Sequence, residues 1–130
     1  MAAKVSLSKI RQVALPVNDV AQATRFYRDT LGMRHLFDAP PGLSFFDCGG
    51  VQLMLAGPDA QGKDGGEQHA VLFYDVSDIK GVHGKIKSAG TKSLEEPHVI
   101  ARMNGREIWI SSFSDGQGNV VSLMSDVAEA

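Results

Sequence analysis

A pattern of predicted elements that occurs twice constrains the fold of this chain more than any other feature. Val17-Asn18-Asp19-Val20 aligns with Val76-Ser77-Asp78-Ile79 at an offset of 59 residues (76 minus 17), and Leu31-Gly32 aligns with Ala89-Gly90 at 58 (89 minus 31). Each copy predicts a strand, a helix and then three strands. Self-similarity at a fixed offset indicates one supersecondary unit that is present twice. Because one helix cannot cover such a sheet alone, we expect the two copies to pack together.

The first copy spans about residues 10–56. A strand is predicted over residues 10–17, and a helix with one apolar face follows over residues 20–31. Asn18 or Asp19 is the expected N-cap of this helix, and Gly32 is its expected stop. Three short strands, separated by glycine-containing turns, are then predicted at residues 34–37, 43–48 and 51–55.

The second copy spans about residues 69–126. It predicts a strand over residues 70–76, a helix from Ser77 or Asp78 to about Ala89, and strands over residues 99–103, 107–113 and 120–124. The polar, glycine-rich residues 57–68 read as a linker. We therefore expect residues 1–130 to form one α+β domain that is built from two βαβββ modules.

The composition excludes several classes of partner. A net charge of −2 gives no electrostatic basis for binding nucleic acid or an anionic membrane. No apolar run approaches the ~18 residues that a membrane span needs. The single cysteine, Cys48, cannot form an internal disulfide and has no cationic neighbour in the sequence that would activate it. We expect a cytoplasmic protein.

Two motifs then point to a family. The turn Phe113-Ser114-Asp115-Gly116-Gln117-Gly118-Asn119 precedes the apolar strand from Val120 to Met124, and Phe26-Tyr27-Arg28-Asp29-Thr30-Leu31-Gly32-Met33 ends the first helix. With the repeat, these motifs resemble the vicinal oxygen chelate superfamily of glyoxalase I, bleomycin-resistance proteins and extradiol dioxygenases. The resemblance covers roughly residues 10–126. It implies curled mixed sheets that form a cup around one cavity, within or between chains, and a homodimer.

The metal-dependent members of that superfamily imply four ligand positions, which fall here on Gln12, Met54, Val71 and Ser122. None of the four is a carboxylate or an imidazole, the donors that divalent metals prefer. A two-residue slip of the alignment would bring in His69, but it would break the match between the two copies. The sequence therefore predicts no metal and no other cofactor.

The first functional hypothesis is that the cup binds a small, largely apolar organic molecule without metal, as the bleomycin-resistance branch implies. Aromatic and thioether side chains suit such a pocket. Trp109 also fits a core role, and Arg102 also fits a simple pair with Glu107 across the hairpin. The candidate ligand-binding residues are Gln12, Met54, Val71, Phe73, Trp109, Ser122, Met124 and Arg102.

The alternative is an enzyme of the superfamily, a lyase, an isomerase or epimerase, or a dioxygenase-like protein. His98 or His69 would then act as general acid or base, because imidazole titrates near neutral pH. Strand alternation predicts that His98 shares a face with Arg102. His35 and His83 read as surface residues. A third hypothesis is a metal-free homologue with a structural or regulatory role.

Overall fold

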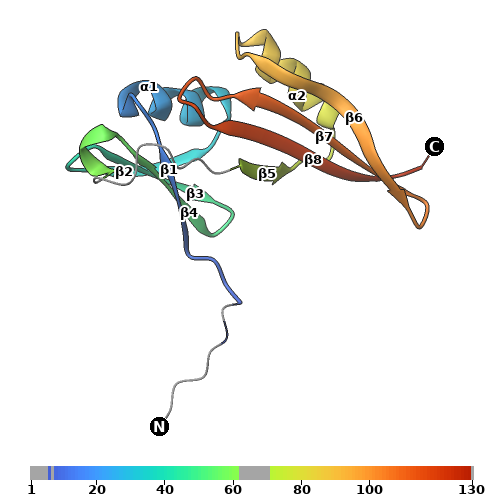
Figure 1. The fold of residues 1–130 in the computed structure, drawn as a ribbon, viewed down its shortest axis with the longest axis horizontal. Helices are drawn as coiled ribbons and strands as arrows, with labels where there is room; N and C mark the ends of the chain where they lie inside the picture. Colours follow the sequence, from blue (N-terminus) through green and yellow to red (C-terminus); the bar gives the residue numbers. More distant parts are fainter. Residues whose placement is uncertain (1–5, 7, 62–70, 130) are drawn as a thin grey trace.

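The computed structural model describes residues 6, 8–61 and 71–129, which form two four-stranded sheets (Figure 1). The order of the first sheet is β1-β4-β3-β2, and the order of the second is β5-β8-β7-β6. In each sheet the first strand runs parallel to the last, and the other neighbours are antiparallel. The strands are β1 (Gln12–Pro16), β2 (Arg34–Ala39), β3 (Leu43–Cys48), β4 (Val51–Ala56), β5 (Val71–Asp75), β6 (Ser93–Met103), β7 (Arg106–Ser114) and β8 (Val120–Ala128).

This identical topology confirms the predicted fold class, α+β with two βαβββ modules of mixed strands. Of the predicted linker, residues 57–68, only residues 57–61 belong to the described part of the chain. The described part contains one turn of 3₁₀ helix, η2 (Pro58–Ala60), which the sequence had not indicated.

Each helix begins and ends where its local sequence predicts. The carboxylate of Asp19 accepts a hydrogen bond from the Gln22 amide (3.0 Å) and caps α1 (Val20–Arg25), and Asp78 caps α2 (Ile79–Ser88) in the same way. Gly32 and Gly90 follow the helices with φ of 70° and 94°, which a residue with a Cβ rarely adopts. The first helix differs in detail, because its second half, η1 (Phe26–Thr30), is a π-helix.

Several strands are longer than the sequence suggests, and β6 and β8 exceed their predicted lengths the most. β6 begins at Ser93 instead of residue 99 and passes through Pro97, which an edge strand tolerates because the missing N–H interrupts no ladder. Shifts of register in its pairing with β7 show that β6 is bulged. β8 continues past residue 124 to Ala128, opposite Arg106.

Both helices lie on the same side of the sheets, the upper side in Figure 1. We call this side the covered face. Its apolar side chains form one core to which both modules contribute: Leu15, Val17, Ala23, Tyr27, Phe46, Leu53, Leu55, Ile79, Ile86, Phe113, Val121 and Leu123. None of the described helices is long and apolar enough to cross a membrane.

A buried network of hydrogen bonds, which we call the joint, connects the two modules on the covered face. Asp115 lies at its centre. One carboxylate oxygen accepts from the backbone N–H groups of Gln117 (2.7 Å) and Asn119 (3.0 Å). The other accepts from the Tyr27 hydroxyl (3.0 Å) and the Asn119 side chain (2.9 Å). Burial, with the charge of Asp115 beside it, raises the pKa of Tyr27 well above its usual range, so Tyr27 remains a donor.

The hydrogen bonds of Gln117 and Asn119 extend the joint to the first module. The Gln117 side-chain oxygen accepts from the backbone N–H groups of Asn18 (2.9 Å) and Asp19 (2.8 Å), and the Asn119 amide donates to the Pro16 carbonyl (2.8 Å). The turn that carries the family motif therefore holds the start of α1 against the second sheet.

Candidate functional site

The side of each sheet away from the helices is the candidate site, and we call it the open face. Because side chains alternate along a strand, neighbours of the buried core residues point to this side. On the first sheet it consists of Gln12, Ala14, Arg34, Phe37, Phe45, Asp47, Gln52 and Met54, which pair across the strands. On the second it consists of Val71, Phe73, Asp75, Glu95, His98, Ile110, Ser112, Ser122 and Met124.

The open face of the first sheet has a polar row beside an apolar row. The Gln52 amide donates to the Gln12 carbonyl (2.6 Å), and the Gln12 amide lies 3.8 Å from the Met54 sulfur. Phe37 stacks on Phe45 with their ring centroids 4.5 Å apart. Amide groups that bond to one another and to a thioether can contact a neutral ligand without requiring a counter-ion.

The open face of the second sheet is apolar at β5 and polar at its centre. Val71 and Phe73 are 53% and 55% exposed, although β5 lies beside the buried strand β8. Ser122 pairs with Phe73 and with Ser112, and it is only 4% exposed. The structure thus brings Phe73, Ser122 and Met124 together on one surface, as the sequence predicted for three of its ligand-binding candidates.

The four positions that correspond to metal ligands do not fit a divalent cation. Gln12 and Met54 meet on the first sheet, and Val71 and Ser122 lie diagonally across β5 and β8. Together they offer an amide, a thioether, an aliphatic group and a hydroxyl, without any carboxylate or imidazole. Within the described ranges, no three His, Cys, Asp or Glu side chains are grouped as a metal site would require.

His98 lies on the open face of the second sheet, where it pairs with Ile110 and so joins the row of Met124. Its Nδ1 lies 2.8 Å from the carbonyl of Glu96. A carbonyl only accepts, so Nδ1 carries the proton and Nε2 of the neutral ring is left as the basic nitrogen. Nε2 lies 3.6 Å from the carboxylate of Glu95, and the side chain is 47% exposed. This arrangement can exchange a proton with a ligand.

Trp109 and Arg102 lie away from this surface, on the covered face. Trp109 pairs with Ser125, which neighbours Met124 and therefore points to the opposite side. Arg102 pairs with Glu107 and donates to its carboxylate (3.0 Å). The prediction that Arg102 shares a face with His98 is wrong, because the strand bulges at Ile100 between them and reverses the alternation.

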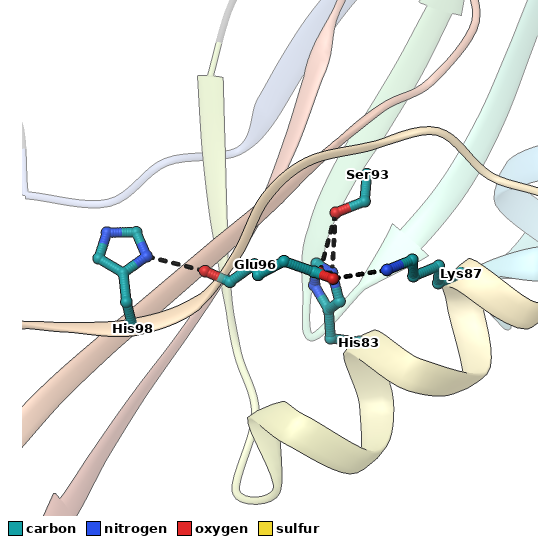
Figure 2. Close-up of polar contacts among 5 residues, drawn as sticks. All are labelled: His83, Lys87, Ser93, Glu96 and His98. Atoms are coloured by element: carbon teal, nitrogen blue, oxygen red, sulfur yellow. Dashed lines mark hydrogen bonds and ion pairs between the residues drawn. The ribbon is translucent and has the colours of Figure 1, made fainter.

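Of the remaining histidines, the candidate His69 lies outside the described residues. His83, expected at the surface, is 2% exposed and stacks on Phe113 with the ring centroids 4.1 Å apart. In Figure 2 its ring points to Ser93 and Glu96, whose atoms lie 3.0 Å and 2.5 Å from Nε2. The Lys87 ammonium forms an ion pair with the same Glu96 carboxylate. This cluster therefore connects α2 to β6.

The Ser93, His83 and Glu96 cluster is not a nucleophile site. A serine nucleophile needs the acid on one ring nitrogen and the hydroxyl on the other. Here both partners lie at Nε2, and the buried Nδ1 has no hydrogen-bond partner in the part of the chain that the structure describes. Cys48 is equally unsuited, because burial and the nearby Asp47 carboxylate raise the pKa of its thiol.

Sequence reasoning missed Glu95, which the structure places beside His98 on the open face. The reason is that the predicted strand began at residue 99, after Pro97. The signal was present in the run Glu95-Glu96-Pro97-His98, where an acid precedes a histidine by three residues. Only the bulged register puts both on one face, since regular alternation would separate them.

The comparisons with known proteins agree with the fold. The model of the Glyoxalase/Bleomycin resistance protein/Dioxygenase superfamily matches residues 9–123. Curated protein sequences give no match to this chain. Among solved structures, the chain resembles a lactoylglutathione lyase from Agrobacterium tumefaciens at 22% identity, with a TM-score of 0.75 and coverage of 92% of this chain and 95% of that one.

Two further solved structures share the fold. One is a superfamily member from Sphaerobacter thermophilus DSM 20745, at 20% identity and a TM-score of 0.76, covering 92% of this chain and 98% of that one. The other is TioX from Micromonospora sp. ML1, at 18% identity and a TM-score of 0.73, covering 91% and 98%. Because the family match spans most of the chain, the protein belongs to the Glyoxalase/Bleomycin resistance protein/Dioxygenase superfamily.

Proposed function

We propose that this protein binds a small, largely apolar organic molecule on its open faces and does so without a metal ion. The observation that carries the proposal is the donor set at Gln12, Met54, Val71 and Ser122, which contains no group that a divalent cation prefers. Thioether and aromatic side chains beside it, Met124 and Phe73, suit the flat or aliphatic body of such a ligand.

The proposal includes a homodimer in which a second copy of the chain covers the open faces. Large apolar side chains are exposed there, with Phe37 at 50%, Val71 at 53% and Phe73 at 55%. Exposed apolar groups gathered on one surface are typical of an interface or a ligand site. A cavity closed between two chains would shield both the ligand and these residues. A cytoplasmic location is part of the same proposal.

A neutral apolar dye, N-phenyl-1-naphthylamine, tests the proposal. We expect saturable binding, seen as a rise in dye fluorescence, that is unchanged by EDTA. Phe73→Gln should weaken binding about tenfold, since it removes an aromatic contact surface worth ~1.4 kcal/mol or more. Ile100→Gln is the matched control, because Ile100 is similarly exposed (51%) but lies at the bulge of β6. Binding that EDTA abolishes would contradict the proposal.

The homodimer needs its own measurement. Sedimentation velocity at micromolar concentration should give a species of about twice the chain mass of 13.9 kDa. Phe73→Glu should shift the distribution towards the single chain, because a charge would be desolvated in the interface. A wild-type protein that sediments only as one chain would rule the dimer out.

The enzyme alternative rests on the orientation of His98, whose Nε2 is left basic on the open face. A base placed there would take a proton from carbon next to a carbonyl. Acetophenone in D₂O is a suitable probe, because its methyl protons exchange measurably by NMR. The alternative predicts exchange faster than in buffer and its loss in His98→Gln, but not in His35→Gln. Exchange no faster than in buffer would exclude this chemistry for flat ketones.

A further inference from the structure

A cavity of about 230 Å³ lies on the covered face of the second sheet, away from the proposed ligand site on the open faces. One wall is residues 77–80, which precede and begin α2. The other wall is a patch of four side chains on β7 and β8, in which Glu107 pairs with Val127 and Trp109 pairs with Ser125. The cavity therefore combines a helix N-terminus, an aromatic ring and a serine.

Ser125 places a buried polar group without a hydrogen-bond partner at this cavity. It is 1% exposed, and its hydroxyl has no hydrogen-bond partner in the described part of the chain. A buried hydroxyl without a partner loses its hydration and gains nothing in return. A ligand atom that accepts a hydrogen bond would satisfy it.

Both carboxylates that line the cavity already accept hydrogen bonds, whereas its one ammonium group forms no ion pair among the described residues. The Glu107 carboxylate already accepts from Arg102 Nε (3.0 Å) and from Trp109 Nε1 (3.3 Å). Asp78 caps the helix by accepting from the Gly81 amide (3.1 Å). The ammonium of Lys80 lies 4.8 Å from the centre of the Trp109 ring and, among the described residues, forms no ion pair.

The N-terminus of α2 adds partial positive charge at the same place, because its first N–H groups have no partner within the helix. The α2 wall thus presents a cation, the helix N-terminus and the apolar side chain of Ile79. The strand wall presents the ring of Trp109, the side chain of Val127 and the Ser125 hydroxyl. The complementary molecule has an anionic, hydrogen-bond-accepting end and a flat apolar body.

We propose that this cavity is a second binding site, for a small aromatic carboxylic acid. The carboxylate pairs with the Lys80 ammonium and accepts a hydrogen bond from the Ser125 hydroxyl. The pairing draws Lys80 away from the face of Trp109, and the ring of the ligand packs there in its place.

Benzoate is the probe, and Trp109 reports on it directly, because it is the only tryptophan in the chain. We expect benzoate to change the tryptophan fluorescence saturably and to release or absorb heat with the same dissociation constant in calorimetry. Benzylamine, which has the same ring and the opposite charge, should not bind. Saturable binding of benzylamine, or no heat and no fluorescence change with benzoate, would overturn the proposal.

Two variants locate the site. Lys80→Gln and Ser125→Ala should each weaken benzoate binding about tenfold, the equivalent of one charge-assisted hydrogen bond. Lys85→Gln is the matched control, since Lys85 is an exposed lysine of the same helix that does not line the cavity. An equal loss in Lys85→Gln would mean that benzoate responds to the charge of α2 in general, which also overturns the proposal.

The site does not depend on the proposed function of the open faces. Phe73→Gln, which removes an aromatic ring from the open face, should leave benzoate binding unchanged. If Phe73→Gln and not Ser125→Ala abolished it, benzoate would bind at the open faces, and the cavity against α2 would carry no second site.

Discussion

The two faces of the sheets differ in how deeply their large apolar side chains are buried. On the covered face, Phe46 is 0% exposed and lies in a core that both helices and both modules share. On the open face, Phe73 is 55% exposed. Phe46 on the covered face is therefore part of the core, whereas Phe73 on the open face is exposed to solvent. The open face is therefore the surface on which the proposed ligand and second chain would bind without disturbing the core.

The polar groups differ in the same way. Asp115 on the covered face is 5% exposed and accepts four hydrogen bonds, two of them from backbone N–H groups. His98 on the open face has one firm bond, to the Glu96 carbonyl, and a carboxylate 3.6 Å away. Groups that are fully satisfied hold the modules together, whereas groups with free capacity can meet a ligand.

The largest contrast is expected between Phe46→Ala and Phe73→Ala. Phe46→Ala should lower the free energy of unfolding by ~3–5 kcal/mol, because it opens a cavity in the shared core. Phe73→Ala should change it by less than about 1 kcal/mol when the protein is dilute enough to be a single chain. Urea unfolding of both variants measures this, and equal losses would show that the open face is packed within the chain.

The next contrast compares two carboxylates of the second module. Asp115→Ala should cost roughly 3 kcal/mol, because it leaves Tyr27 and two buried backbone N–H groups without an acceptor. Asp126→Ala removes an exposed ion pair with Arg106 and should cost under about 1 kcal/mol. Thermal unfolding of the two variants is the measurement. A mild Asp115→Ala would contradict the role given to the joint.

Charging the open face tests whether its centre is as poorly hydrated as Ser122 suggests. The double variant Met54→Glu with Ser122→Glu should lose about 2 kcal/mol at pH 7, because burial raises the pKa of a carboxyl and penalises its charged form. Adding Gln12→His and Val71→His supplies a ligand set, and nickel should then restore part of the loss. A double variant that melts like the parent would show that these positions are well solvated.

The smallest effect concerns Glu96, at the edge of the covered face. The Lys87 ammonium beside it, assisted by Ser93 and His83, holds the pKa of Glu96 below its usual range. Its contribution to stability is therefore complete above the pKa of an unfolded glutamate and is lost as the pH falls through the folded value. Glu96→Gln should flatten the acid side of a melting curve series from pH 3 to 7, and so should Lys87→Met. Parallel curves for variant and parent would remove this contact from the account.

The sequence predicts the fold well because its signals are local. The caps Asp19 and Asp78 and the stops Gly32 and Gly90 each act within a few residues, and the repeat then fixes the topology. That Ser122 and Met124 lie on the same face of their strand follows from alternation alone.

The candidate site is less predictable because its faces depend on register between strands. The bulge at Ile100 separates Arg102 from His98, and only the pairing of Trp109 with Ser125 shows which side the indole takes. The burial of His83 could have been read from the sequence. Ile79, Val82, His83 and Ile86 have the i, i+3, i+4, i+7 spacing of a buried helix face.

Elemental analysis of the protein purified without chelators tests the central claim most directly, that the open faces form a ligand site which holds no metal. The amide, thioether, aliphatic and hydroxyl groups of Gln12, Met54, Val71 and Ser122 predict that nickel, zinc, iron and manganese are all far below one atom per chain after gel filtration. About one atom of any of these metals per chain, lost when Gln12 and Met54 are replaced by alanine, would contradict it.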